Sequence, residues 1–211
     1  MGTGAVGGCF GGLLARNGED VTFIARGPNL EAIRNHGLHI ESAAVGDFIV
    51  RPKAIEVPDA SCTADLVLFC VKGYHNERAI DDLRPAIGEN TTVLTLQNGI
   101  GSGDQLTDAF GDDRVLLGAA YVEATRKAPG VMAQVGGPCR TVFGEADGSA
   151  STRTEVICDA FLRAGIDAQI STDILKDLWS KLVMVCALAG SICGSSAVDD
   201  VSVESGDEPH H

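Results

Sequence analysis

The chain opens with the string MGTGAVGG, in which Gly2, Gly4 and Gly7 have the spacing G-x-G-x-x-G. This spacing is typical of the turn between a strand and a helix in dinucleotide-binding folds. One glycine allows the tight turn, one lets the backbone approach a pyrophosphate, and one allows close helix packing. The pattern predicts a helix over residues 4–17 and a buried strand over residues 21–25 (VTFIA), at the distances that such a fold needs.

The region from Gly2 to about Gly144 alternates short β runs with amphipathic stretches, which predicts an α/β domain with a mainly parallel sheet. The strand that should precede the glycine turn is missing, because only Met1 stands before Gly2. The other expected strands are 38–42, 48–57, 65–71, 91–96, 115–122, 131–135, 141–144 and 166–170, and the expected helices are 29–35, 76–86, 103–110 and 154–164. Strands 131–135 and 141–144 are expected to be antiparallel.

The alternation of strands and helices ends at about residue 172. A long helix is expected, with Thr172 or Asp173 as its N-cap. Its first half is amphipathic, and the residues expected on one face are Ile174, Leu175, Leu178 and Leu182. Its second half is apolar nearly all round, which predicts burial against another chain, as in a homodimer, or against residues that the chain lacks. Residues 195–211 are polar and acidic, which is typical of a disordered tail.

Composition excludes several classes of function. The formal charge of −13 and a pI near 4.6 over 211 residues argue against nucleic acid as a partner, since phosphate binding needs a basic surface. The apolar runs are too short to span a bilayer and no leader is visible, so we expect a soluble cytoplasmic protein without membrane contact. The seven cysteines form no C-x-x-C pair and have no metal-ligand spacing, so no metal site is expected.

Two features point to the cofactor. The phosphates of a dinucleotide would bind to the amides of the turn, formed by Gly2, Thr3, Gly4, Ala5, Val6 and Gly7. Arg26 then stands directly after strand 21–25, where an NAD-specific fold has Asp or Glu. A guanidinium suits a 2′-phosphate, so the expected cofactor is NADPH. The alternatives are a structural glycine turn and an arginine that is merely solvated.

Three further side chains are candidates for the site. Lys72 follows strand 65–71 and Asn98 follows strand 91–96, at the sheet edge where ligands of open α/β folds bind. Their alternative roles are a surface charge and an Asn-Gly turn residue. Lys181 lies at the border of the buried face of the last helix. It is either a lysine that extends to solvent or, if it faces a cleft, a general acid whose pKa is lowered by burial.

Taken together, these strings resemble the ketopantoate reductase (2-dehydropantoate 2-reductase) family. The matching strings are GTGAVGG (2–8), VTFIARG (21–27), LVLFCVKGY (66–74), LQNGIG (96–101), PGVMAQVGGP (129–138) and DILKDLWSKL (173–182). The resemblance implies NADPH-dependent reduction of ketopantoate to pantoate, a step toward pantothenate and coenzyme A. It implies that Lys181 donates the proton, that Asn98 and Lys181 meet substrate, and that Lys72 and Asn98 line the cofactor cleft.

The resemblance also implies a domain plan. We expect a Rossmann-like doubly wound domain over residues 1–170, the first helix of an all-helical domain over 171–194 and the tail over 195–211, with the chain truncated at both ends. Val185 and Ala189 stand where many members have substrate-facing asparagines, and the family's serine and glutamate for substrate hydroxyls have no counterpart. The alternatives are therefore reduction of another 2-keto acid by NADPH, or a non-catalytic nucleotide-binding fragment.

Overall fold

The computed structural model describes the backbone of residues 1–196 and the side chains of residues 1–188. Most of the expected tail, residues 197–211, lies outside the described residues. Ser195 and Ser196 belong to the end of the last helix. No helix in the described part of the chain is long and apolar enough to cross a membrane.

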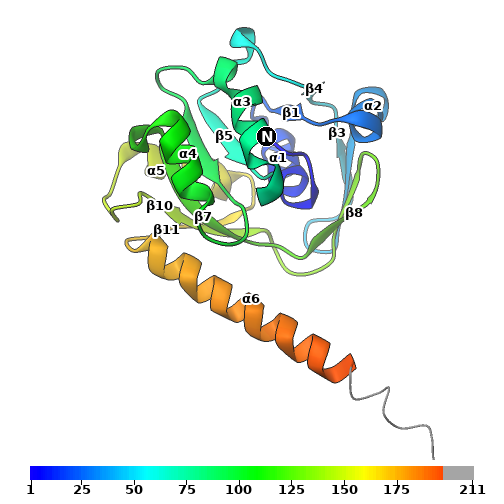
Figure 1. Ribbon diagram of the computed structural model, residues 1–211. Helices are drawn as coiled ribbons and strands as arrows, with labels where there is room; N and C mark the ends of the chain where they lie inside the picture. The colour runs from blue at the N-terminus through cyan, green and yellow to red at the C-terminus, as the bar shows by residue number, and fades with distance from the viewer. Residues whose placement is uncertain (197–211) are drawn as a thin grey trace, which may run out of the picture.

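The largest sheet has five strands in the order β11-β10-β7-β6-β5 (Figure 1). Strands β5, β6 and β7 are parallel, β10 runs antiparallel to β7, and β11 is parallel to β10. Their bounds are β5 Leu66–Phe69, β6 Thr92–Thr95, β7 Val115–Tyr121, β10 Arg140–Gly144 and β11 Asp167–Ile170. All four residues of β6 are buried, as expected for a strand covered on both faces.

Two smaller sheets complete the strand structure. Strand β1 (Thr22–Ile24) pairs in parallel with β4 (Lys53–Ile55). The remaining four strands have the order β3-β2-β9-β8. Their bounds are β2 Leu38–Ser42, β3 Phe48–Val50, β8 Ala124–Ala128 and β9 Val131–Gln134.

Helices cover both faces of the five-stranded sheet, as a doubly wound fold requires. Two neighbouring residues of β6, which point to opposite faces of the sheet, show this. Leu94 belongs to a hydrophobic core cluster with residues of α1 and α5, and Val93 belongs to a second cluster with residues of α3 and α4. The helices are α1 Ala5–Arg16, α2 Gly27–His36, α3 Asn76–Leu83, α4 Ser102–Phe110, α5 Thr152–Arg163 and α6 Ile174–Ser196. The short 3₁₀ helices are η1 Ala60–Cys62, η2 Gly73–His75, η3 Arg84–Ala86 and η4 Asp112–Arg114.

The mainly parallel α/β fold is confirmed, but strand pairing differs from the expectation in three places. The expected strand 48–57 is two strands, and its second half, β4, continues the sheet of β1. Strand β8 was not expected from the sequence. The two late strands, β9 and β10, are each antiparallel to a neighbour but lie in different sheets.

Helix α6 begins after Asp173, whose Oδ1 accepts from the Lys176 amide at 3.2 Å, as the N-cap prediction required. Ile174 is fully buried against the sheet, whereas Leu175, expected on the same face, is 51% exposed. The prediction for Leu175 is therefore wrong, because α6 touches the sheet along a narrow stripe. In the second half Val183, Met184 and Leu188 are exposed, so the burial expected there against another chain or against residues that the chain lacks stays a prediction. Figure 1 shows α6 projecting away from the rest of the fold.

Candidate functional site

The glycine turn leads into α1 with its backbone uncovered. Gly2 has a φ of 88°, a conformation that favours glycine. A Cβ on Gly7 would lie 2.4 Å from the Gly2 carbonyl oxygen, so the turn closes only with glycine at this position. A Cβ on Gly4, the N-cap of α1, would meet no atom within 4 Å, and no side chain caps the helix. The amides of the first turn of α1 therefore face open space, as an anion-binding helix start requires.

Hydrogen bonds fix this turn between β1 and β5. The Cys70 amide donates to the Met1 carbonyl oxygen at 2.9 Å, and the Thr3 hydroxyl donates to Ile24 O at 2.9 Å. Buried Asn29 donates from Nδ2 to Thr3 O at 3.0 Å and accepts from the Gly130 amide at 2.8 Å. Sequence reasoning missed this role of Asn29, because its two partners lie far away in the chain.

Arg26 lies at the end of β1 and is already paired. Its guanidinium forms an ion pair with Asp82 of α3, and Arg78 Nε lies 3.9 Å from the same carboxylate. The Arg26 and Asp82 side chains are 36% and 21% exposed. Asp82 carries no local sequence signal for this contact, and it is the group that a phosphate at Arg26 would have to displace.

Lys72 and Asn98 both lie at the carboxyl ends of their strands, as predicted, and both are exposed. The Lys72 ammonium makes no hydrogen bond or ion pair with any side chain of residues 1–188, and is free to meet an anion. The Asn98 amide is turned toward α6, where it contacts Lys181.

A buried polar network connects the ends of β5 and β6. Gln97 donates from Nε2 to Val71 O at 2.7 Å and to Asn76 Oδ1 at 2.6 Å, and Asn76 donates to Gln105 Oε1 at 2.7 Å. The network holds the loop that carries Lys72 beside the loop that carries Asn98. Sequence reasoning missed Gln97 and Asn76 as positioning residues, and the QNG string was the only local signal.

Lys181 is the most unusual side chain of the site. It is 8% exposed, and its ammonium donates to Asn98 Oδ1 at 2.8 Å and to Ala120 O at 2.5 Å. The Tyr121 ring centroid lies 5.2 Å from the same nitrogen. No carboxylate is among these partners, and burial lowers the pKa of Lys181 below its ordinary value. A lysine in this setting can give up a proton more readily than one in water.

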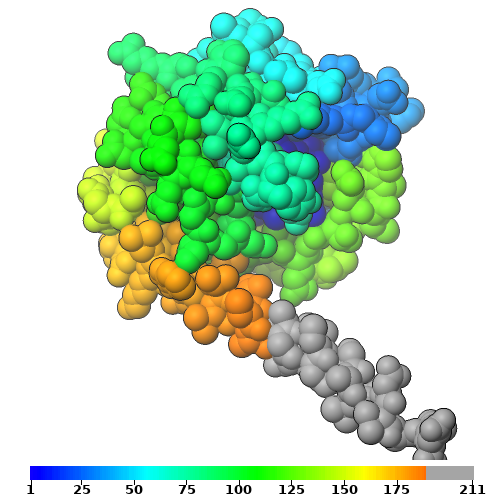
Figure 2. Space-filling model, in the orientation of Figure 1, coloured from blue at the N-terminus to red at the C-terminus, as the bar shows by residue number. Residues whose placement is uncertain are grey.

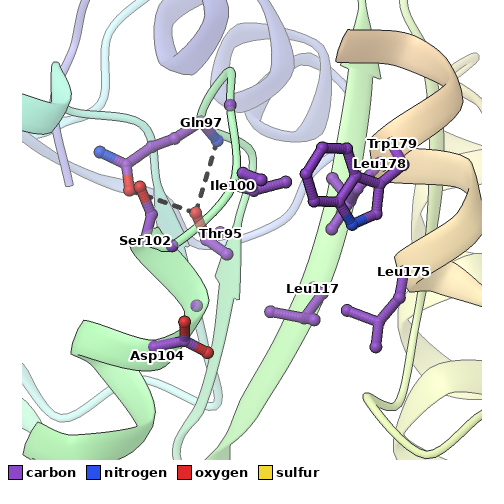
Figure 3. Close-up of a pocket in the computed structure, with 13 residues that line it drawn as sticks. Thr95, Gln97, Ile100, Ser102, Asp104, Leu117, Leu175, Leu178 and Trp179 are labelled. Carbon is purple, nitrogen blue, oxygen red and sulfur yellow. Dashed lines mark hydrogen bonds between the residues drawn. The ribbon is translucent and has the colours of Figure 1, made fainter. Parts of the chain in front are cut away.

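A small cavity of about 310 Å³ lies between the loop after β6 and helix α6 (Figure 3). Leu175, Leu178 and Trp179 of α6 form one wall, and Leu117 of β7 lies between the two elements. The opposite wall carries polar groups, including Gln97 and Thr95, whose side chains are hydrogen-bonded at 3.3 Å. The cavity combines an apolar wall with a polar wall, as small-molecule sites do.

A hollow in the surface lies above the start of the chain. Figure 2 shows the first residues of the chain, in dark blue, at the floor of a hollow between α2, the blue-green segment after β5 and the yellow-green β8–β9 segment. Among the described side chains, no three His, Cys, Asp or Glu residues are grouped to hold a metal ion. The arrangement can bind a phosphorylated ligand at the start of α1 and transfer a proton from Lys181.

Both the sequence and the fold are similar to those of known proteins. Residues 1–148 match the family described as ketopantoate reductase PanE/ApbA. The chain belongs to this family. It is 33% identical over 189 residues to a 2-dehydropantoate 2-reductase of Pyrococcus horikoshii, and 32% identical over 190 residues to an uncharacterized oxidoreductase of Bacillus subtilis. A crystal structure of 2-dehydropantoate 2-reductase from Geobacter metallireducens superimposes with a TM-score of 0.82 at 36% identity.

The chain is shorter than these relatives of the ketopantoate reductase family. The alignments cover 89% of this chain but 60% of the Pyrococcus protein, and 87% of this chain but 60% of the Geobacter structure. Val185, at one of the positions where the resemblance led us to expect asparagine, is 41% exposed on α6 one turn after Lys181. The side chain of Ala189, the other such position, lies outside the described residues.

Proposed function

We propose that this member of the ketopantoate reductase family binds NADPH in the hollow above the glycine turn and reduces the 2-keto group of ketopantoate to give pantoate. The proposal places the chain at the step toward pantothenate and coenzyme A that the family's name implies. The observation that carries it is the buried Lys181 ammonium, which Asn98 and the Ala120 carbonyl hold at the same sheet edge as the glycine turn.

The residues at the turn fit a dinucleotide. The uncapped start of α1 would hold the pyrophosphate, with Gly4 leaving room for its oxygens. The absence of an acidic residue in the first turn of α1 removes a source of repulsion. Lys72, which is exposed and has no ion-pair partner among residues 1–188, would meet a ribose or phosphate oxygen.

Arg26 supports NADPH over NADH. Its guanidinium can make two charge-assisted hydrogen bonds to a 2′-phosphate. Arg78 stands on the other side of Asp82 and would add a second positive charge once the carboxylate moves away. NADH has no 2′-phosphate, so it could not replace the ion pair that Arg26 makes with Asp82.

The proton donor in this proposal is Lys181. When bound at the glycine turn, NADPH would supply the hydride that reduces C2 of the keto acid, and the carbonyl oxygen would then need a proton. The Lys181 ammonium gives a proton to this oxygen, and its lowered pKa makes the transfer easier. Asn98 keeps the ammonium at the sheet edge because its Oδ1 accepts one of the lysine protons.

Val185 bears on which keto acid is the substrate. Val185 offers an apolar surface next to the lysine, which favours a 2-keto acid with an apolar side chain over one with hydroxyl groups. Reduction of such an acid by NADPH is therefore the second candidate function.

The test is keto-acid-dependent oxidation of NADPH, measured for wild type, Lys181→Ala and Lys176→Ala. Lys176 is a matched control, because it is an exposed lysine on the same helix. We expect wild type and Lys176→Ala to turn over ketopantoate, and Lys181→Ala to lose about 100-fold or more in kcat.

Other outcomes separate the alternatives. Turnover of apolar 2-keto acids but not of ketopantoate would establish the second candidate. Binding of NADPH without any turnover would identify a nucleotide-binding fragment. Equal activity of the two lysine variants would contradict the role of Lys181.

A further inference from the structure

Tyr121 is the last residue of strand β7 and lies beside the Lys181 ammonium. Lys181 Nζ lies over the face of the Tyr121 ring, 5.2 Å from the ring centroid. The residue before Tyr121 is Ala120, whose carbonyl oxygen accepts a hydrogen bond from the same nitrogen at 2.5 Å. The end of one strand therefore provides two of the groups that surround the ammonium.

The hydrogen bonds of the Lys181 ammonium leave one of its N–H groups without an oxygen acceptor. A lysine ammonium has three N–H donors. Two of them bond to Asn98 Oδ1 at 2.8 Å and to Ala120 O at 2.5 Å, and no third acceptor is found among residues 1–188. The third N–H can therefore turn to the Tyr121 ring in the free protein, and to the oxygen of a keto acid when one is bound.

Among residues 1–188, no carboxylate pairs with the Lys181 ammonium. Helix α6 packs on β7 and β10 and faces α4 across the small cavity (Figure 3). The charged groups at these contacts are Arg140 of β10, Asp104 of α4 and Asp177 of α6. Arg140 forms its ion pair with Asp167. Asp177 accepts a hydrogen bond from the Ser171 hydroxyl instead. The charge of the ammonium is therefore met by two neutral oxygens and by an aromatic ring.

The ring opposes the effect of burial on the ammonium. The face of an aromatic ring attracts a cation that lies within about 6 Å of its centroid, and the attraction is stronger where water is excluded. Lys181 is 8% exposed and Tyr121 is half-buried, so water is largely excluded from this contact. Burial lowers the pKa of Lys181, whereas the ring favours the charged form and acts in the opposite direction.

Arg140 restricts the orientation of the Tyr121 ring. The two residues lie opposite each other in the antiparallel pairing of β7 with β10. The guanidinium carbon of Arg140 lies over the ring, 5.8 Å from its centroid, and Arg140 Nε lies 3.5 Å from Asp167 Oδ2. The ring is therefore held by the neighbouring strand before any substrate binds.

We propose that Tyr121 is a positioning residue for the proton donor, whose ring face holds the Lys181 ammonium at the end of β7 and stabilises its charged form. The proposal rests on the proposed function in one respect, namely that Lys181 is the proton donor. The contact uses the face of the ring and not its hydroxyl. Phenylalanine should therefore replace Tyr121 without loss, and leucine should not.

The experiment titrates Lys181 directly, through the NMR signal of its isotopically labelled Cε, in wild type, Tyr121→Phe, Tyr121→Leu and Phe110→Leu. The Lys181 signal is identified by its absence from Lys181→Ala. Phe110 is the matched control, because its ring belongs to the same core cluster but carries Arg84. We expect Tyr121→Leu to lower the pKa of Lys181 by about half to one pH unit, and the other two variants to leave it unchanged.

Keto-acid reduction provides the second measurement. In Tyr121→Leu, kcat/KM should begin to fall at a pH that is lower by the same amount, because the donor loses its proton earlier, and the KM for NADPH should not change. Equal pKa values of Lys181 in Tyr121→Leu and wild type would overturn the positioning role, and so would an equal movement of the signals of the other lysines. A shifted titration of Lys181 in a chain that reduces no keto acid would overturn the proposed function, and the positioning role with it.

Discussion

The Lys181 ammonium donates a hydrogen bond of 2.8 Å to Asn98 Oδ1 across 83 positions of sequence. This contact joins the long helix α6 to the loop after β6, and it places a buried positive charge at the edge of the sheet where the glycine turn also lies. Its consequences can be measured in several ways.

The pH dependence of keto-acid reduction should report the pKa of Lys181. A proton donor must be protonated, so kcat/KM should fall as the pH rises through this pKa. Burial lowers the pKa, so the fall should begin below the range of an ordinary lysine, whose pKa is 10.5. Asn98→Asp would place a carboxylate beside the ammonium and raise the pKa, which moves the fall about one pH unit or more upward.

Asn98→Ala is the control for that experiment, because it removes the acceptor oxygen beside the ammonium without adding charge. Its profile should show no upward shift. An Asn98→Asp profile that coincides with the wild-type profile would contradict Lys181 as the titrating group.

Two glycine substitutions should separate binding from folding. Gly4→Ala adds a Cβ in open space at the start of α1, so we expect a stability loss of at most about 1 kcal/mol. The dissociation constant for NADPH should nevertheless rise at least about tenfold, because the Cβ stands where the phosphate must approach. Calorimetry and denaturant unfolding measure the two effects.

Gly7→Ala should affect folding first, because its Cβ would lie 2.4 Å from Gly2 O and must disrupt the turn itself. We expect a stability loss of more than about 2 kcal/mol. Gly137→Ala, at an open position far from the turn in sequence, should change neither property. Unchanged NADPH affinity in Gly4→Ala would place the phosphates elsewhere.

Asp82 should weaken the preference for NADPH. Its carboxylate competes with a 2′-phosphate for Arg26, so Asp82→Asn should tighten NADPH binding about three- to tenfold at low salt and leave NADH binding unchanged. Asp81→Asn is the matched control, because Asp81 pairs with Arg84 instead. Arg26→Gln should weaken NADPH binding and spare NADH. An Arg26→Gln variant with unaltered preference would contradict the 2′-phosphate site.

The buried amino group of Met1 should make stability depend on pH. Its pKa in the folded chain lies below 8.0, so between that pKa and 8.0 the unfolded chain binds more protons. The free energy of unfolding should therefore rise with pH in this window, by up to about 1.4 kcal/mol per pH unit, and level off above it. The Cys70 thiol beside it stays neutral there, because burial raises its pKa to about 11.

Acetylation of the amino group isolates this effect, because all other titrating groups are common to both forms. The difference in unfolding free energy between the free and acetylated chains should shrink as the pH rises toward 8.0. A difference that is independent of pH would contradict the burial of the Met1 ammonium.

Local patterns predicted most of the elements that position the site. The glycine turn, Arg26 after β1, Lys72 after β5 and Asn98 after β6 follow from strand ends that periodicity can locate. The start of α6 at Asp173 follows from capping chemistry. The structure places all of these as expected, whereas their roles toward cofactor and substrate stay predictions.

What could not be predicted depends on contacts between distant segments. Asp82 reaches Arg26 across 56 positions, and Gln97 reaches Asn76 across 21. Neither pair leaves a periodic signal, because helix and strand patterns record only which face is buried. The exposure of Leu175 could not be predicted either. The amphipathic pattern predicts which side of α6 faces the sheet, but it does not predict how wide the contact between α6 and the sheet is.

The most direct test of the account follows the transferred hydrogen. The protein is incubated with ketopantoate and NADPH that carries deuterium at both C4 positions of the nicotinamide, and the product is analysed by mass spectrometry. The account predicts pantoate with one deuterium at C2, formed by wild type and by Lys176→Ala and strongly reduced in Lys181→Ala. Pantoate without deuterium, or labelled pantoate formed equally well by Lys181→Ala, would contradict it.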